Sequence, residues 1–437
     1  MIGATLDAIF RSEHARLMAS ISRFARDLDV AEEAVAEAFA RAARVWGQSG
    51  LPDNPAAWLQ TVARHVAIDR LRARDRAGAD VDLELESVPM TTEVTPQDAA
   101  DEGTLGLVFA CCRQNLPERT RMTLAMRLVL GLETREVARL LVEDEAATAQ
   151  RLVRAKRELR DEGERFEAPP RRKWGEHLRL AARLVYVLFS EGYVATKGDR
   201  LLREELALRA IELGRVLLDV APCPTTRALL ALMLLHQARA PARVDANGNL
   251  LTLEEQDRTR WSRPAIDEGL ALLDRAIAES PRIAGPEHLP DAFVLQAAIA
   301  ALHCRAPTAE ATDWAQIAAL YGGLLRVEAT PVVELNAAVA LAMAGRLDAG
   351  LRWINELERR GELANHHTLA LAKAELLLKK GVLKQAERYF RRARRLAQNA
   401  AEQRHVDRRL RHLESRALEG AGADGDAPAS DDETAEG

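Results

Sequence analysis

The sequence predicts an all-α protein. Aromatic residues make up only 4% of the 437 residues, while Ala, Leu and Arg are abundant. Strands favour β-branched and aromatic residues, so this composition favours helices over a sandwich or a barrel. Hydrophobic residues make up 48% and charged residues 29%, an ordinary globular composition that can form a sizeable core. At roughly 150 residues per domain, the length indicates two or three domains.

The first predicted domain covers residues 1–76 and consists of helices. One helical stripe of the segment LDVAEEAVAEAFARAARVW carries Val30, Ala34, Val35, Ala38, Ala42 and Val45. In the following turn, Asp53 or Asn54 can cap the next helix, and Pro55 falls in its first turn. The bases of that next helix are Arg64, Arg70, Arg72, Arg74 and Arg76.

Two acidic segments separate and end the predicted domains. Residues 77–104 carry eight acids and no base, and Pro89 and Pro96 oppose a continuous helix there. Residues 417–437 carry seven acids and no base, and we expect this tail to be disordered. The total charge is −5, so setting these 15 acids aside leaves +10 on the rest. The pattern indicates a basic folded body joined to an acidic linker and an acidic tail.

A helix-turn-helix is predicted within residues 105–165. LPERTRMTLAMRLVLGL is expected to form one helix that ends near Gly131, and 134–141 a short second one. After a tight turn at 142–144, Asp144 can cap the helix EAATAQRLVRAKREL. Leu152 and Ala155 are expected to face the core. The periodicity then places Gln150, Arg151 and Arg154 on the outer face.

Residues 171–416 are predicted to form a series of amphipathic helices. Two stretches near the end repeat each other, because Ala338 and Gly345 recur 36 residues later as Ala374 and Gly381. This offset is close to the roughly 34 residues of a tetratricopeptide repeat. We therefore expect repeat-like helical hairpins in this extension.

The sequence lacks the motifs of common catalytic and metal sites. The four cysteines form no CxxC pair, and no HExxH, P-loop or dinucleotide-binding glycine pattern is present. We expect no cofactor, no metal and no enzymatic activity. The N-terminus does not resemble a signal peptide. The longest uncharged apolar stretch in the second half, 292–304, is shorter than the roughly 20 residues of a membrane helix. A cytoplasmic protein with no membrane partner is the expectation.

Several segments together resemble a known family. LDVAEEAVAEAFARAARVW and NPAAWLQTVARHVAIDRLRARDR resemble region 2 of extracytoplasmic-function sigma factors of the sigma-70 family. LPERTRMTLAMRLVLGLETREVARLL and AQRLVRAKREL resemble their region 4. LVYVLFSEGYVAT and TPVVELNAAVALAMAG resemble the tetratricopeptide-like extension of one subgroup. The resemblance implies a sigma region 2 domain, a region 4 helix-turn-helix domain at 105–165, and a helical extension at 171–416.

The resemblance also implies partners and contact residues. The partners would be core RNA polymerase, promoter DNA, and a regulatory protein or ligand at the extension. Polymerase would be contacted by Asp29, Glu33 and Glu37. The −10 element would be contacted by Arg64, His65, Arg70, Arg72 and Arg74. The −35 element would be contacted by Gln150, Arg151, Arg154, Lys156 and Arg157, the last two at phosphates.

Alternative functions stay open at this point. A DNA-binding regulator with a helical-repeat sensor domain would also carry a helix-turn-helix. A repeat scaffold with basic faces, or an enzyme of another mechanism, is a third class. The charged cluster from Glu254 to Arg258, followed by Trp261, has two interpretations. A structural ion-pair network around a packed Trp is favoured over a ligand contact.

Overall fold

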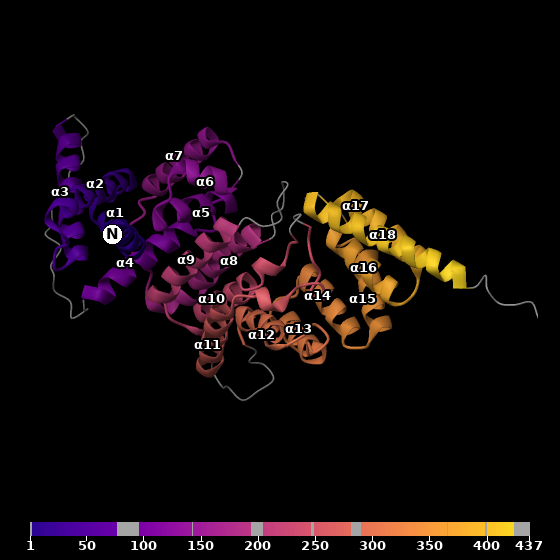
Figure 1. Cartoon of the computed structure of the whole chain (residues 1–437). Coiled ribbons are helices and arrows are strands. Elements are labelled where there is room, and N and C mark those ends of the chain that lie inside the picture. The colour runs from indigo at the N-terminus through magenta and orange to yellow at the C-terminus, as the bar shows by residue number, and fades with distance from the viewer. Residues whose placement is uncertain are drawn as a thin grey trace, which may run out of the picture. The chain divides into compact units, whose positions relative to one another are not determined.

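The prediction of an all-α fold is confirmed by a computed structural model (Figure 1). The structure describes residues 2–76, 96–141, 143–193, 204–245, 249–280, 290–364, 366–397 and 400–423. Every regular element within these ranges is a helix. A single isolated bridge joins Val244 to Leu250.

The N-terminal part packs three helices together, α1 (Ile2–Ala25), α2 (Leu28–Ser49) and α3 (Pro55–Arg76). Asp27 caps α2 by accepting hydrogen bonds from the amides of Asp29 (2.8 Å) and Val30 (3.0 Å). Of the two candidate caps of α3, the structure selects Asn54, whose Oδ1 accepts from the Ala57 amide at 3.0 Å. Such caps satisfy amides that the first helical turn leaves unpaired.

The apolar stripe of α2 forms much of the core between these helices. The stripe residues from Val30 to Ala42 are buried as predicted, but Val45 is 42% exposed. Trp46 is buried in its place, and its ring lies edge-on to Trp58 with centroids 5.4 Å apart. The stripe advances by four residues at this point, because the large indole fills the space between α2 and α3 better than valine.

The next helices are α4 (Pro96–Cys111), α5 (Glu118–Leu124), α6 (Thr134–Leu141) and α7 (Glu145–Asp161). The helix expected to run to Gly131 continues past α5 as a π-helical turn, Ala125–Val129. Gly131 has a positive φ of 71°, and a Cβ there would lie 2.6 Å from the Phe10 ring and 2.9 Å from His14. Glycine is therefore required where this segment turns against α1.

The extension begins with α8 (Trp174–Tyr193), α9 (Glu204–Val220), α10 (Pro224–Gln237) and α11 (Arg263–Glu279). Helices α8 and α9 pack closely at Gly192, where a Cβ would lie 2.4 Å from the Ala207 backbone nitrogen. Three-residue 3₁₀ turns lie at Arg171–Lys173, Ala240–Ala242 and Arg258–Arg260.

The remaining helices are α12 (Ala292–Arg305), α13 (Trp314–Val327), α14 (Pro331–Met343), α15 (Leu347–Arg359), α16 (His367–Lys379), α17 (Leu383–Leu396) and α18 (Ala400–Ala423). The pairs α14–α15 and α16–α17 are the two repeated stretches, and their turns have the same geometry. Gly345 and Gly381 have φ values of 87° and 82°. The Arg346 amide donates to Leu341 O, and the Val382 amide donates to Leu377 O, again with a shift of 36 residues. The structure thus contains two matching helical hairpins.

Two boundaries differ from the predicted ones. Helix α4 begins at Pro96, so the last part of the expected linker 77–104 is helical. Proline fits there because the first turn of a helix needs no amide donor. Helix α18 continues to Ala423, seven residues into the expected tail 417–437. Residues 77–95 and 424–437 lie outside the described residues.

The described chain divides into two compact units. The first holds residues 2–76, 96–141, 143–193, 204–234 and 271–280. The second holds residues 235–245, 249–270, 290–364, 366–397 and 400–423. None of the helices in these ranges is long and apolar enough to cross a membrane.

Candidate functional site

The second helix of the helix-turn-helix, α7, presents a polar face to solvent. Asp144 caps this helix as predicted, accepting from the Ala147 amide at 2.9 Å. Leu152, Ala155 and Leu159 are buried against the rest of the unit. Gln150 and Arg154 are exposed on the opposite face, as expected. A side-chain amide and a guanidinium on one open helical face can pair with base edges in a major groove.

Arg151 does not lie on that open face, and the prediction that it points outward was wrong. Its side chain is only 22% exposed and lies 2.5 Å from Glu143 Oε2. It also donates to the Thr123 hydroxyl at 3.3 Å. Arg151 sits at the border of the buried stripe, and the carboxylate of Glu143 beside it draws its guanidinium toward α5. In this structure Arg151 stabilises the helix-turn-helix.

Lys156 and Arg160, further along α7, bind the acidic start of α2. Lys156 Nζ lies 2.9 Å from Asp29 Oδ1 and also pairs with Glu32. Arg160 Nη2 lies 2.8 Å from Asp29 Oδ2. Burial disfavours charge on Lys156, but the carboxylates of Glu32 and Asp29 outweigh burial and raise the pKa of Lys156 above its ordinary value. A residue expected to contact DNA phosphates is thus engaged by another part of the chain.

The same network includes two further residues, Arg127 and Asp27. Arg127, in the π-helical turn, lies 2.7 Å from Glu32. Asp27 lies 2.8 Å from Arg74 of α3. Burial raises the pKa of Asp27, but the Val30 amide, Arg160 and Arg74 together bring that pKa below its ordinary value. The network therefore joins α2 to α3, to the π-helical turn and to α7.

The other residues expected to contact polymerase form ion pairs closer by. Glu33 lies 3.3 Å from Arg70 of α3. Glu37 lies 2.7 Å from Arg41 and 3.5 Å from Arg44 of its own helix. The hydrogen bond from Arg41 is the main reason that the pKa of Glu37 is below its ordinary value. Both carboxylates lie at the surface, where such pairs are easily exchanged for other partners.

The bases expected at the −10 element lie along α3. Arg64 stacks over the Phe24 ring, 4.9 Å from its centroid. His65 and Arg72 are exposed. Arg70 and Arg74 are the two that pair with carboxylates of α2 and its cap. The exposed part of α3 is a basic surface with one aromatic ring beside it, which suits single-stranded nucleic acid.

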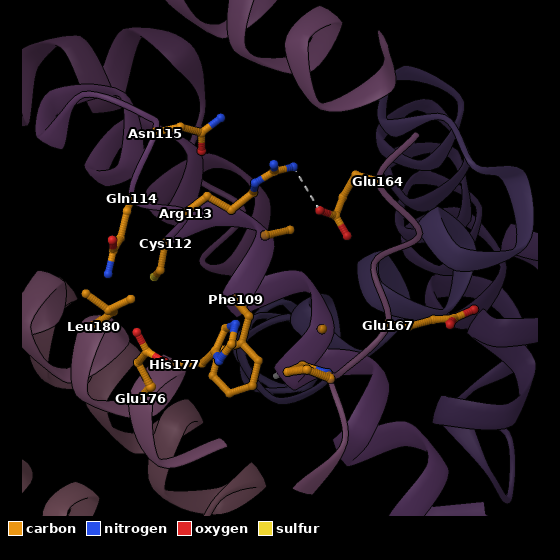
Figure 2. Close-up of a pocket in the computed structure, with 13 residues that line it drawn as sticks. Phe109, Cys112, Arg113, Gln114, Asn115, Glu164, Glu167, Glu176, His177 and Leu180 are labelled. Carbon is orange, nitrogen blue, oxygen red and sulfur yellow. Dashed lines mark hydrogen bonds and ion pairs between the residues drawn. The ribbon is translucent and has the colours of Figure 1, made fainter. Parts of the chain in front are cut away.

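A separate pocket of about 580 Å³ lies beside the helix-turn-helix (Figure 2). The end of α4, the segment after α7 and the start of α8 line it. Arg113 pairs with Glu164 at 3.1 Å across the pocket, and the rings of Phe109 and His177 lie 5.2 Å apart. Burial raises the pKa of the Cys112 thiol to about 12, so this thiol is a poor nucleophile. Among the described residues, no group of side chains is arranged to hold a metal ion.

The charged cluster of the extension has the contacts of a structural network. Trp261 is buried, and the guanidinium of Arg258 lies 4.5 Å from its ring centroid. Arg258 also donates to the carbonyls of His303 (2.8 Å) and Ala306 (2.5 Å), at the end of α12. Carbonyls at a helix end have no partner within the helix, so Arg258 satisfies them.

Comparison with known families identifies the N-terminal helices. The family model of sigma-70 region 2 matches residues 9–77, which include α2, α3 and most of α1. The chain belongs to the sigma-70 family. Its sigma region 2 gives it a sigma-factor-like role in transcription initiation, involving core RNA polymerase and promoter DNA.

Two further comparisons concern the rest of this sigma-70 family member. Residues 178–277 match a family of unknown function, DUF6596. The chain is similar to "Uncharacterized protein R00370" of Rhizobium meliloti (strain 1021), with 39% identity over 415 residues. The match covers 93% of this chain and 96% of that protein, so both belong to one family along nearly their whole length. No solved structure matches the chain.

Proposed function

We propose that the protein is an extracytoplasmic-function sigma factor that directs core RNA polymerase to promoters with −10 and −35 elements. The observation that carries the proposal is the pairing of a sigma region 2 with a helix-turn-helix whose helix α7 leaves Gln150 and Arg154 open. Plain duplex binding needs the second of these features but not the first.

The roles of the basic residues follow from their surroundings. Arg154 pairs with guanine and Gln150 with adenine in the major groove of the −35 element. Arg157 is exposed and contacts phosphate. On α3, Arg64, His65 and Arg72 hold the opened strand of the −10 element. This division leaves Arg151 as a structural residue.

Ion pairs between α2 and α7 hold together the two parts that we propose to contact DNA, and we call this the closed arrangement. Asp29 is the proposed polymerase contact on α2, and it is bound by Lys156 and Arg160 of α7. Core polymerase and α7 therefore compete for the same carboxylate. We propose that polymerase binding releases α7 and so frees Lys156 for DNA phosphate. Such a mutual exclusion keeps the free protein from binding promoters on its own.

The helical extension serves regulation or partner binding in this proposal. The matching hairpins α14–α15 and α16–α17 support a tetratricopeptide-like organisation, because both length and turn geometry repeat. Arrays of such hairpins provide surfaces for proteins or peptides. The protein contributes binding and strand opening, and needs no cofactor or chemistry of its own.

The experiment is a binding assay with purified core RNA polymerase. The full chain is passed over gel filtration with core, and promoter DNA binding is measured with and without core. We expect co-elution with core, and specific DNA binding only in its presence. Glu37→Lys is expected to weaken core binding, while Asp53→Lys, an exposed acid ahead of α3, serves as the matched control.

Two outcomes would contradict the proposal. Specific duplex binding without core, and no co-elution, would favour a DNA-binding regulator with a helical-repeat sensor domain. An absence of both core and DNA binding would favour a repeat scaffold.

A further inference from the structure

Helices α15, α16 and α17 line a polar groove of about 440 Å³. Side chains from all three helices and from the α16–α17 turn line it. Its charged lining residues are Asp348, Arg352, Lys373, Lys380 and Arg388. Four of these are bases and one is an acid, so the groove is positively charged.

Two of the four bases are neutralised within the protein. Lys373 lies 2.5 Å from Glu358 and donates to the Tyr389 hydroxyl at 2.7 Å. Lys380 lies 2.6 Å from Asp348, the acid of the groove. These pairs leave the groove with a net positive charge that comes from its remaining bases.

The other two bases, Arg352 and Arg388, are exposed and lie on different helices. Among the described residues, neither has a carboxylate within ion-pair distance. Arg388 instead lies over the Tyr389 ring, 5.4 Å from its centroid. Asn355 and Gln385 add amide donors to the same groove. Arg352 interacts with Asp348 only at longer range. Two guanidiniums without a close ion pair, with amides beside them, suit a ligand that carries several carboxylates.

An acidic segment of the chain itself follows helix α18, which packs against α16 and α17. Arg394 of α17 lies 2.8 Å from Asp407 of α18, so α18 returns alongside α17. Arg409 pairs with Glu375 on the face of α16 that lies away from the groove. Helix α18 ends at Ala423, and the 14 residues that follow carry no base. Their acids are Asp424, Asp426, Asp431, Asp432, Glu433 and Glu436.

The length of this segment is sufficient to reach the groove. Fourteen extended residues span up to about 46 Å. Arg409 of α18 contacts α16, and Ala423 lies 14 residues further along α18, a distance of about 21 Å. The extended segment can therefore return to α16 and pass around this helix, which is about 10 Å across. The segment is tethered to the protein, so its effective concentration at the groove is about millimolar. A free peptide would have to be present at a similar concentration to compete with it.

We propose that the acidic C-terminal segment, residues 424–437, binds in the basic groove between α15, α16 and α17. Its carboxylates pair with Arg352 and Arg388, and they compete with Asp348 for Lys380. The segment then occupies its own groove until an acidic segment of a partner displaces it. This proposal is independent of the transcriptional role.

The test uses a fluorescent peptide of residues 424–437 and the full chain in two forms. One form is the parent. In the other, the six acids of the segment are changed to Asn or Gln, which empties the groove of its own occupant. Fluorescence polarisation measures peptide binding. We expect the neutralised form to bind the peptide at least about fivefold more tightly, because the parent's own segment competes.

Matched variants in the neutralised form locate the binding site. Arg388→Glu and Arg352→Glu are each expected to weaken binding at least about tenfold, since each reverses a charge in the groove. Arg395→Glu changes an exposed base of α17 outside the groove, and we expect less than about a twofold effect there. Melting curves verify that each variant is folded.

Three results would overturn the proposal. Equal weakening by Arg388→Glu and Arg395→Glu would mean general attraction to α17. Equal peptide affinity of parent and neutralised forms would mean that the segment does not occupy the groove. Binding of an unrelated acidic peptide, without binding of 424–437, would assign the groove to an outside partner. The assay contains no polymerase or DNA, so its outcome is separate from that of the proposed function.

Discussion

Lys156 Nζ lies 2.9 Å from Asp29 Oδ1, and this contact links the proposed DNA-contacting helix α7 to the proposed polymerase-contacting helix α2. The sequence predicts contacts of both residues with other molecules, and in the structure they contact each other. Opposite charges suited to DNA and to polymerase are also suited to one another. The closed arrangement is thus a direct consequence of the two functional surfaces being complementary.

Glu32→Gln tests this closed arrangement without altering a proposed contact to polymerase or DNA. Glu32 binds both Lys156 and Arg127, so its loss should weaken the α2–α7 contact by about 1–2 kcal/mol. Amide hydrogen exchange in α7 should speed up by about tenfold, as this free energy implies. Glu37→Gln removes only pairs within α2 and should leave α7 exchange unchanged. Unchanged exchange in Glu32→Gln would show that the network does not hold the two parts together.

Arg154→Ala should reduce use of the cognate promoter about ten- to hundredfold, because a guanidinium paired with a base is lost. Core binding should survive, since Arg154 is exposed and distant in sequence from region 2. Arg157→Ala is the matched control on the same helix, and it should weaken all promoters alike. In vitro transcription on a panel of −35 variants measures both. If Arg154→Ala and the parent have identical promoter preferences, the proposal that Arg154 of α7 recognises a base is wrong.

Arg151→Ala should act on stability rather than on promoter choice. The substitution leaves Glu143 and Thr123 without the guanidinium that joins them. We expect a loss of about 1–2 kcal/mol in the free energy of unfolding. Denaturant melts measure this loss, and the promoter panel should give unchanged preferences at low temperature. If Arg151→Ala is as stable as the parent but has an altered promoter preference, Arg151 contacts DNA instead.

Acid should destabilise the protein through His14. Burial, with a further contribution from Arg127, lowers the pKa of His14 from 6.5 to about 4. In the unfolded chain His14 is protonated below about pH 6.5, whereas in the folded chain it is protonated only below about pH 4. The free energy of unfolding therefore decreases as the pH falls through this window. By pH 5 the loss is about 2 kcal/mol. His14→Leu should remove this share of the difference between pH 7 and pH 5 in denaturant melts. The same difference in parent and variant would contradict the assignment.

Gly106→Ala should destabilise the protein, because the new Cβ would lie 2.3 Å from the backbone carbonyl of Phe166. Backbone cannot move aside as a flexible side chain can, so we expect a cost of about 1–3 kcal/mol. Gly175→Ala is the control, since its Cβ meets only the end of Arg179 at 3.8 Å. In that helix alanine should be neutral or stabilising. Thermal melts compare the two, and equal melting temperatures would contradict the close approach.

Local features were the most predictable part of the fold. Helix class, the Asp144 cap and the 36-residue repeat follow from short-range patterns, and the structure agrees with each. The π-helical turn at 125–129 was not predictable, because helical periodicity changes little over one turn. Val45 and Trp46 exchanged places for a tertiary reason, the packing of α3 onto α2.

The site was predictable in its residue types but not in its pairings. Exposed Gln150 and Arg154 follow from the period of α7. The inward turn of Arg151 depends on Glu143, which lies eight residues away across a turn. The contacts of Asp29 with Lys156 span more than a hundred residues, and no local pattern encodes them. The sequence shows that the start of α2 is acidic and that α7 is basic. These charges alone do not indicate that the two helices contact each other.

Run-off transcription with purified core RNA polymerase tests whether the protein acts as a sigma factor. The full chain is used, because α8 packs on α4 and α5, α9 packs on α4, and removal of the extension would expose these surfaces. Upstream fragments from the source genome serve as templates, with Arg154→Ala and Arg157→Ala as paired variants. We expect start sites that depend on the added protein and that move or weaken selectively with Arg154→Ala. Stable binding to core with no specific start site on any fragment would contradict a role as a sigma factor.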